Sequence, residues 1–152
     1  MDFPIDIGSY VNLKLNGKGK LSESELETLS KNIELVRDAV IATTAFARAK
    51  GLGGHTGGPY DIVPETLIVD SLREGGTKIH DEFFDEAGHR SALQYVRGVV
   101  RGKMGSEKLL HYREYGSGLA GHPEPELLDC IDFSTGRLGH AAGHVNGVAF
   151  AN

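Results

Sequence analysis

Three histidines, each preceded by a glycine, are the residues of this chain best suited to chemistry. His55, His89 and His122 are 34 and 33 residues apart. A glycine before an imidazole lets the backbone turn sharply and approach a ligand closely. A neutral imidazole both donates and accepts hydrogen bonds, and it exchanges protons near neutral pH. We therefore expect three loops to converge on one pocket, for a ligand that carries phosphate and hydroxyl groups.

A fourth glycine-rich segment follows, Ser134-Thr135-Gly136-Arg137-Leu138-Gly139-His140. Arg137 is either a contact for a phosphate group or a residue of a surface ion pair, and the sequence leaves both open. His140 and His144 are four residues apart, which is a spacing of metal ligands on a helix face. The run lacks the glutamate of a zinc hydrolase and an obvious third ligand. A surface or interface face is therefore favoured over a metal site.

The remaining reactive residues favour ordinary structural roles. The pairs Asp81-Glu82 and Asp85-Glu86 suggest paired-carboxylate catalysis, but solvated loop charge is the expectation. Cys130 is the only cysteine, so no internal disulfide forms, and we expect it to be a small core residue beside a strand.

Composition limits the classes of protein that need to be considered. The 152 residues are 24% charged and 39% hydrophobic, as in a single globular domain. A net charge of -5 and sixteen scattered basic residues argue against nucleic acid as a partner. No apolar run approaches the ~20 residues that cross a bilayer, so no membrane partner is expected. A single cysteine favours a reducing, cytoplasmic location.

The clearest predicted element is a helix that starts after Ser22. Ser22 and Glu25 form a capping box, in which each side chain satisfies the other's backbone N–H. Lys50 and Gly51 supply the cation and the glycine of a helix C-terminus. Apolar residues at three- and four-residue steps mark its buried face: Leu26, Leu29, Ile33, Val36 and Val40. Residues 1–20 before it form either a short strand or an ordered N-terminal arm.

The rest of the chain predicts shorter elements. A second helix is expected to start near Asp61, a good N-cap, and to run to Gly75-Gly76, with Pro64 in its first turn. The other expected elements are a short strand or extended piece over 82–85, a helix through Leu93 to Val100 that stops at Gly102, a helix capped by Ser106 that ends at Gly116, a strand over 131–133, a turn over 136–139 and a helix over 141–152.

The last of these elements predict the fold class. A strand, a glycine turn and a helix are the first half of a βαβ unit, whose strand needs neighbours that this sequence does not contain. We therefore expect an α/β fold that is mostly helical here, with an incomplete parallel sheet and flanking helices.

At these residues the sequence resembles the N-terminal part of transketolase and its thiamine diphosphate-dependent relatives. Four ordered motifs over roughly residues 35–152 carry the resemblance. They are Gly54-His55-Thr56-Gly57-Gly58-Pro59 for the family's Gly-His-Pro-Gly, Ala87-Gly88-His89 for its Asn-Gly-His, Ala120-Gly121-His122-Pro123-Glu124 for its Pro-Gly-His-Pro-Glu, and Ser134 to His140 for its Thr-Thr-Gly-Pro-Leu-Gly-Gln.

The resemblance implies catalytic roles for two histidines. His55 would face the reactive end of the cofactor and the substrate's carbonyl and hydroxyl groups, and His122 would hydrogen-bond substrate hydroxyls. Arg137 joins them as a candidate substrate contact. The implied reaction cleaves and transfers carbon units next to a carbonyl, with the cofactor as electron sink.

The resemblance also implies a cofactor, thiamine diphosphate, with His89 at its diphosphate and with Gly136 and Leu138 lining it. The family's Gly-Asp-Gly metal motif and its cofactor-activating glutamate are not among the 152 residues. Magnesium is therefore expected with ligands outside this chain and none within it. Thr56, Ala87, Arg137 and His140 depart from the family's motifs, which leaves a ketose or a 2-oxo acid as the substrate.

The sequence thus predicts an N-terminal arm over 1–20 and a partial transketolase-like domain over 21–152. It would be the N-terminal part or a subunit of a cytoplasmic transferase of carbohydrate metabolism, inactive alone. Its partner would be the remainder of the enzyme or a complementary subunit, in a homodimer or hetero-oligomer. Three alternatives stay open: a piece of a longer enzyme, one subunit of a split enzyme, or a non-catalytic remnant that serves as a binding or dimerisation module.

Overall fold

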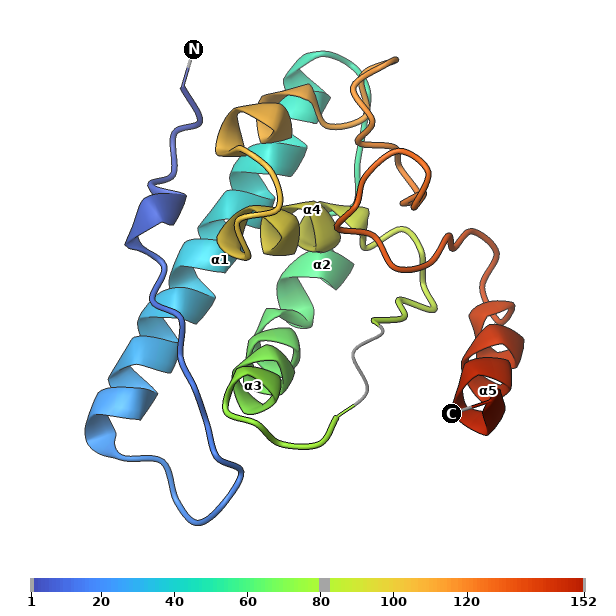
Figure 1. Ribbon diagram of the computed structural model, residues 1–152. Helices are drawn as coiled ribbons and strands as arrows, with labels where there is room; N and C mark the ends of the chain where they lie inside the picture. The colour runs from blue at the N-terminus through green and yellow to red at the C-terminus, as the bar shows by residue number, and fades with distance from the viewer. Residues whose placement is uncertain (1, 80–82, 152) are drawn as a thin grey trace.

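The computed structural model of the protein describes residues 2–79 and 83–151. Within these ranges every regular element is helical and no β-strand occurs. The elements are the 3₁₀ turn η1 (Ile7–Ser9), α1 (Glu23–Ala49), α2 (Gly57–Asp61), α3 (Val63–Glu74), α4 (Ser91–Val100), the 3₁₀ helix η2 (Ser106–His111) and α5 (Ala141–Ala151). Figure 1 shows α3 and α4 packed beside the long helix α1, with α5 on the side away from α1.

The predicted ends of α1 are confirmed. Ser22 Oγ accepts a hydrogen bond from Glu25 N at 3.3 Å, and Glu25 Oε2 accepts one from Ser22 N at 2.7 Å. The helix ends at Ala49, and Gly51 follows with φ of 75°, a left-handed conformation that glycine adopts without strain. The chain therefore leaves α1 where the sequence placed the first histidine loop.

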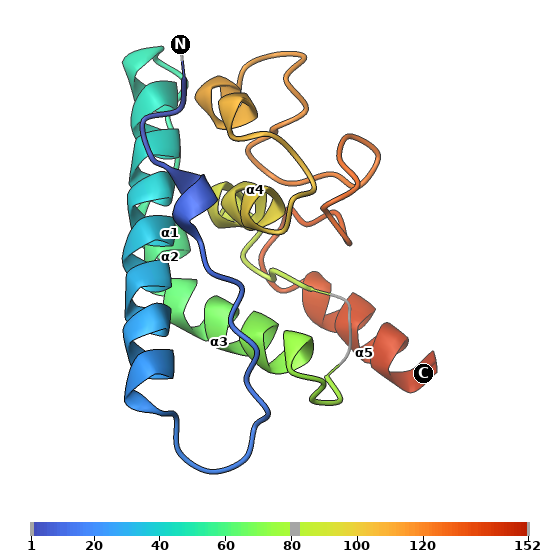
Figure 2. The same cartoon turned by 60° about the vertical axis from the view of Figure 1, so that its left-hand side comes forward.

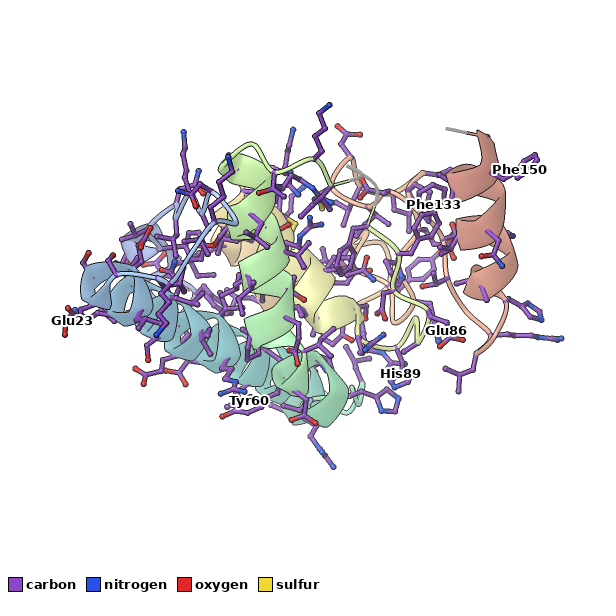
Figure 3. All side chains as sticks on the ribbon, turned by 90° about the horizontal axis from the view of Figure 1, so that it is seen from below. Glu23, Tyr60, Glu86, His89, Phe133 and Phe150 are labelled. Atoms are coloured by element: carbon purple, nitrogen blue, oxygen red, sulfur yellow. The ribbon has the colours of Figure 1, made fainter. Side chains whose placement is uncertain are left out.

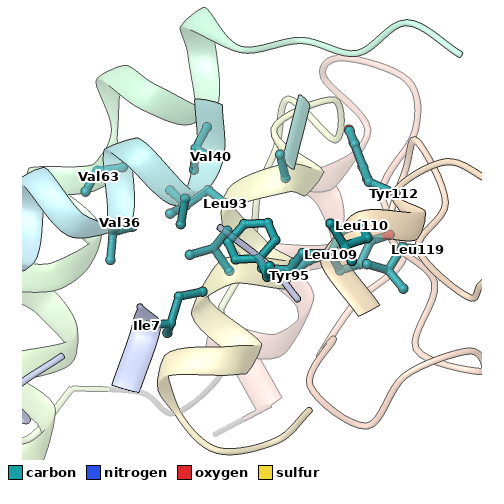
Figure 4. Close-up of a cluster of buried hydrophobic side chains, with 14 of the residues drawn as sticks. Ile7, Val36, Val40, Val63, Leu93, Tyr95, Leu109, Leu110, Tyr112 and Leu119 are labelled. Atoms are coloured by element: carbon teal, nitrogen blue, oxygen red, sulfur yellow. The ribbon is translucent and has the colours of Figure 1, made fainter. Parts of the chain in front are cut away.

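The hydrophobic core lies where α1 meets α3, α4 and η2 (Figure 4). Its largest side chains come from all of these elements and the following loop: Val36, Val40, Val63, Leu67, Leu93, Tyr95, Leu109, Tyr112 and Leu119. Leu29 also belongs to the core, whereas Leu26 of the predicted face is 52% exposed because the core begins only one turn further along the helix. The core thus holds α4 against α1, and these two helices carry the histidine loops.

The second predicted helix, expected to start near Asp61, is confirmed as α3, but the predicted N-cap at Asp61 is wrong. Asp61 is the last residue of α2, and α3 begins two residues later at Val63. Pro64 explains the break: it has no N–H to donate to the carbonyl of Tyr60 four residues earlier, so one continuous helix cannot form. Its place in the first turn of α3, and the end of α3 before Gly75, are as predicted.

The third predicted helix is confirmed as α4, but the fourth is shorter than expected. η2 ends at His111, and its N-cap is Gly105, without a side-chain capping bond from Ser106. Beyond it Arg113 adopts φ of 64° and its N–H donates to Leu119 O at 2.8 Å. This bond closes a loop, so the chain does not continue as a helix toward Gly116.

The predicted strand over 131–133 is wrong. In the short strand or extended piece predicted over 82–85, residues 83–85 form no strand, and Glu82 lies outside the described residues. The two segments nevertheless contact each other. Phe84 and Phe133 stack with ring centroids 3.9 Å apart, and Asp132 Oδ2 accepts a backbone N–H of the 83–85 segment at 3.0 Å. In a β-ladder, backbone N–H groups of one strand bond to backbone carbonyls of the other. Here side chains make the contacts, so the described residues confirm the helical part of the predicted fold and not its sheet.

Residues 2–20 cross α1 and α3 as an extended segment with one 3₁₀ turn (Figure 2). Asn32 of α1, 2% exposed, accepts from Val11 N at 3.1 Å and donates to Val11 O at 2.7 Å. Further along, Leu15 N donates to a carbonyl of α3 at 2.8 Å. Gly75 makes room for this crossing, because a Cβ there would lie 1.9 Å from Leu15 O.

The C-terminal helix is confirmed as α5, although Asn152 lies outside the described residues. Its residues include no Asp, Glu, Lys or Arg, yet only Ala141 is buried and Phe150 is 95% exposed. Among the described residues, no helix combines the length and the apolar character that crossing a membrane requires.

Candidate functional site

The first histidine loop is anchored at both ends. Thr56 Oγ1 lies 2.8 Å from Thr44 Oγ1 on α1. Since the Thr44 hydroxyl already donates to helix carbonyls at 3.0 and 3.1 Å, Thr56 is the donor in this pair. Gly54 passes the Tyr112 ring so closely that a Cβ would lie 3.2 Å from Cε1. The exposed His55 lies between these two points.

The second histidine loop is a tight turn before α4. The Asp85 side chain is fully buried, and its Oδ1 accepts from Ala87 N at 3.2 Å and from Arg90 Nε at 2.7 Å. Gly88 follows with φ of 67°. His89 Nδ1 lies 2.8 Å from Ala87 O, and because a carbonyl only accepts, Nδ1 carries a proton. The expectation that Asp85 is solvated loop charge is wrong.

The third histidine loop is held on α4 by two buried hydroxyls. Tyr95 OH donates to Ala120 O at 2.7 Å, and Ser91 Oγ donates to Gly121 O at 3.0 Å. Ser91 and Tyr95 are both fully buried. These bonds fix the two residues directly before His122, whose own side chain is exposed.

A third hydroxyl extends this buried network. Tyr112 OH lies 2.8 Å from Ser91 Oγ, and since the single serine proton goes to Gly121, the tyrosine is the donor. Burial raises the pKa of the Tyr112 phenol, while the bond to Ser91 lowers it by a smaller amount. Burial also raises the pKa of Tyr95. Both phenols therefore stay protonated and remain donors at neutral pH.

The loops converge on Gly88. The rings of His55 and His89 meet edge to face with centroids 4.7 Å apart. A Cβ on Gly88 would lie 3.1 Å from His122 Cδ2, 3.1 Å from Thr135 Oγ1 and 3.2 Å from Gly136 N. Figure 3 shows His89 beside Glu86, far from Glu23 at the start of α1. Three histidines distant in sequence, and part of the fourth segment, thus share one region.

Thr135 is the clearest indication of a ligand in this region. Its Oγ1 is buried and has no hydrogen-bond partner among the described residues. Buried hydroxyls in folded proteins are almost always paired, so an unpaired one beside Gly88 and Gly136 fits a ligand that supplies an acceptor. A phosphate or a substrate hydroxyl meets this requirement, which is the chemistry that the sequence predicted for the pocket.

The rest of the fourth segment faces solvent. It lines an open cavity of about 380 Å³ together with Glu124 and the start of α5, and the lining residues are Glu124, Ser134, Thr135, Gly136, Arg137, His140, Ala141 and His144. Leu138 is 67% exposed, so no packing partner is seen for the side chain expected on the cofactor rings. Arg137 forms no ion pair with any described residue, which leaves its guanidinium accessible from the cavity.

Two carboxylates hold the fourth segment in place. Ser134 Oγ donates to Glu124 Oε2 at 2.5 Å, and Gly139 N donates to Glu86 Oε1. Glu86 therefore takes part in loop geometry. His140 and His144 are exposed, and no set of three His, Cys, Asp or Glu side chains within 2–79 and 83–151 is placed to bind a metal ion.

Sequence reasoning missed the residues that position the histidines. Ser91 and Tyr95 appear in the sequence as polar members of an otherwise apolar helix face, and that is the one signal that could have identified them as buried donors. The Asp85–Arg90 pair, five residues apart across a turn, gives no periodic signal. Cys130, expected to be a core residue beside a strand, is half-buried against the core and lies beside Gly98 of α4.

The chain is similar to known proteins over the region that holds the histidine loops. The family model described as "Transketolase, thiamine diphosphate binding domain" matches residues 32–152. A transketolase of Staphylococcus aureus (strain MW2) is 39% identical over 124 residues, 78% of this chain. One of Staphylococcus epidermidis (strain ATCC 35984) is 31% identical over the same length, and a probable transketolase of Schizosaccharomyces pombe is 30% identical over 136 residues, 84% of the chain.

The chain spans 19% of the length of each of these relatives. No solved structure matches it significantly. The family match covers α4, α5, all three histidine loops and most of α1, and therefore every part of the site described above. The chain belongs to the transketolase family, within its thiamine diphosphate binding domain.

Proposed function

We propose that this chain is the N-terminal part or a subunit of a transketolase-like enzyme, and that the region around Gly88 forms part of its cofactor and substrate site. The observation that carries the proposal is the convergence of the histidine loops. His55 and His89 are in ring contact, and Gly88 lies against His122 and Thr135. Such a cluster of imidazoles and an unpaired hydroxyl suits a ligand with several oxygen atoms.

The residues near Gly88 fit one side of thiamine diphosphate. Thr135 Oγ1 and His89 would bind diphosphate oxygens, and Gly136 and Leu138 would line the cofactor. When bound, the cofactor supplies the carbon nucleophile and electron sink for carbon–carbon cleavage. The diphosphate charge also needs a metal ion, which we propose is magnesium held by ligands outside this chain.

His55 and His122 would bind and orient the substrate. Both are exposed on anchored glycine loops, so their rings can reach hydroxyl groups of a ligand and transfer protons to and from them. The accessible guanidinium of Arg137 would bind an anionic group of the substrate, a sugar phosphate or a 2-oxo acid. The activity would be ketol or acyl transfer in carbohydrate metabolism, in the cytoplasm.

The partner would be the rest of the same enzyme, either on one longer chain or as a complementary subunit, in a homodimer or hetero-oligomer. The short coverage of the relatives supports this, because this chain corresponds to 19% of their length. The sheet of the predicted α/β fold would then be built with that additional polypeptide.

The test compares His55→Ala and His122→Ala in the assembled enzyme. We expect turnover to fall by about 10²–10⁴-fold, the usual contribution of a positioned acid or base, with little change in melting temperature. His111→Ala is the matched control, because His111 is equally exposed but pairs with Glu114 outside the site. If melting collapses while the folded enzyme keeps its specific activity, these histidines are structural and the proposal fails.

Calorimetric titration separates the alternatives. The 152-residue chain alone should bind magnesium and thiamine diphosphate weakly or not at all, and the assembled enzyme should bind them tightly. If the assembly also fails to bind them, the chain is a non-catalytic binding module.

A further inference from the structure

The turn that carries His89 is held by a buried ion pair. Arg90 Nε donates to Asp85 Oδ1 at 2.7 Å, Arg90 Nη2 lies 2.5 Å from the same oxygen, and Gln94 Nε2 donates to Oδ2 at 3.4 Å. The Asp85 side chain is fully buried, and that of Arg90 is 25% exposed. A buried carboxylate is costly unless it is paired and hydrogen-bonded. Asp85 therefore cannot move without breaking several bonds at once.

The same carboxylate also binds the backbone of Ala87, the residue whose carbonyl meets His89. Asp85 Oδ1 accepts from Ala87 N, in the Glu86–Ala87 peptide group, at 3.2 Å. The next peptide group, Ala87–Gly88, supplies a carbonyl that meets His89 twice: at the backbone N–H, 2.7 Å away, and at Nδ1, 2.8 Å away. A continuous set of hydrogen bonds thus runs from Arg90 through Asp85 and Ala87 to the imidazole.

This set of bonds determines which nitrogen of His89 is presented to the site. Because Nδ1 donates to a carbonyl, a neutral ring must leave Nε2 without a proton. Nε2 is on the side of the first loop, since a Cβ on Gly58 would lie 3.9 Å from it and 3.2 Å from Arg90 Cγ. Arg90 therefore lies between the first and second histidine loops and holds the turn from one side.

We propose that Asp85 and Arg90 are positioning residues that fix the Nδ1–H tautomer of His89 and direct its Nε2 toward the His55–Gly58 loop. The tautomer follows from the geometry alone. The role of this tautomer in binding diphosphate or substrate rests on the proposed function. The tautomer and its role in binding are tested separately below.

The ion pair between Arg97 and Asp70 provides the matched control. It is also buried, and it is bidentate, with Arg97 Nε 2.6 Å from Oδ2 and Nη2 2.7 Å from Oδ1 of Asp70. It starts from the same helix α4 but joins α3, where Asp70 also lies near Arg73 and Arg101. The Arg97 guanidinium lies over the Phe83 ring, 4.5 Å from its centroid. Asp70→Asn therefore removes a buried carboxylate from α4 without removing a bond to Ala87 or His89.

The experiment measures the tautomer of His89 by two-bond ¹H–¹⁵N correlation in the labelled 152-residue chain, at a pH where the imidazole is neutral. His89→Gln assigns the signal. In the native chain Nδ1 should be protonated. In Asp85→Asn and Arg90→Gln the ratio of Nδ1–H to Nε2–H should fall about fivefold, which corresponds to one ordinary hydrogen bond. Asp70→Asn should leave the ratio unchanged.

Two results overturn the proposal: an unchanged ratio in folded Asp85→Asn, or an equal change in Asp70→Asn. If Asp85→Asn does not fold, Arg90→Lys decides, because lysine keeps the charge but lacks the Nε–H, and a smaller change in the same direction is expected. Titration of the assembled enzyme with thiamine diphosphate then tests the function. If the Asp85→Asn variant shifts the tautomer of His89 but binds thiamine diphosphate with unchanged affinity, Asp85 is a positioning residue and His89 is not part of the cofactor site.

Discussion

Ser91→Ala should be among the most destabilising single-atom deletions in this protein. The Ser91 hydroxyl donates to Gly121 O and accepts from Tyr112 OH, so its removal breaks two hydrogen bonds and leaves both partners unpaired. A lost bond costs about 1 kcal/mol, and a buried unpaired group about 1–3 kcal/mol. Gly121 is partly exposed and can be rehydrated, whereas Tyr112 is 1% exposed. We expect a loss of about 2–4 kcal/mol, most of it at the phenol.

Tyr112→Phe is the informative comparison for this prediction. It removes the donor but leaves Ser91 bonded to Gly121, so the cost should be only about 1 kcal/mol. The double variant should be no less stable than Ser91→Ala alone, since the unpaired phenol is then absent. Chemical denaturation of the three variants measures these differences, and for a chain of this length each 1 kcal/mol shifts the melting temperature by about 2–4 °C.

The reasoning is refuted if the two single substitutions cost the same and add in the double variant. Additivity would mean that the two hydroxyls act independently, and the donor order from Tyr112 through Ser91 to Gly121 would be wrong.

Three further predictions concern the arm, the pH dependence of stability and the C-terminal helix. Asn32→Ala should cost about 1–3 kcal/mol and make residues 2–20 the first site of limited proteolysis, because Val11 loses both of its bonds to α1; unchanged protease resistance would contradict this. Above about pH 10 the free energy of unfolding should fall by up to about 1.4 kcal/mol per pH unit for each raised phenol, since the unfolded chain releases that proton first. Denaturation at several alkaline pH values should show a shallower decline in Tyr95→Phe, and an equal slope would exclude Tyr95 as a source. The chain alone should self-associate through α5, so light scattering should show smaller species for Phe150→Glu; if the native chain is a monomer at all concentrations, the apolar surface of α5 does not drive association.

Local rules predicted much of this fold. The capping box at Ser22, the glycine after α1 and the face of α4 follow from interactions within a few residues, and the structure has all three. Elements that depend on distant partners were harder to predict. The 131–133 segment has strand-like residues, but Phe133 stacks on Phe84 and Asp132 binds a backbone N–H, so side chains take the place of a ladder.

In the candidate site, too, the sequence predicted some features and not others. The regular spacing of Gly-His pairs predicted loops that meet in one place. The residues that hold those loops are buried donors and acceptors, and their partners lie up to thirty residues away, as in the bond from Ser91 to Gly121. Asp85 is the clearest example of a residue whose role the sequence did not predict. Its burial depends on Arg90 folding back across the turn, and no sequence pattern predicts that contact.

The anchoring of the three loops determines which distances in the site can change independently. His89 and His122 are both attached to the first turns of α4, one through Arg90 and the other through Ser91 and Tyr95. The His55 loop is attached to α1 through Thr56, and through Gly54 it also packs on Tyr112, whose phenol bonds to Ser91 of α4. A small rotation of α4 against α1 would carry His89 and His122 together and would change the 4.7 Å contact between the rings of His55 and His89, and Tyr112 would limit that movement. The packing of α4 on α1 would therefore set how far the three histidines can separate around a ligand.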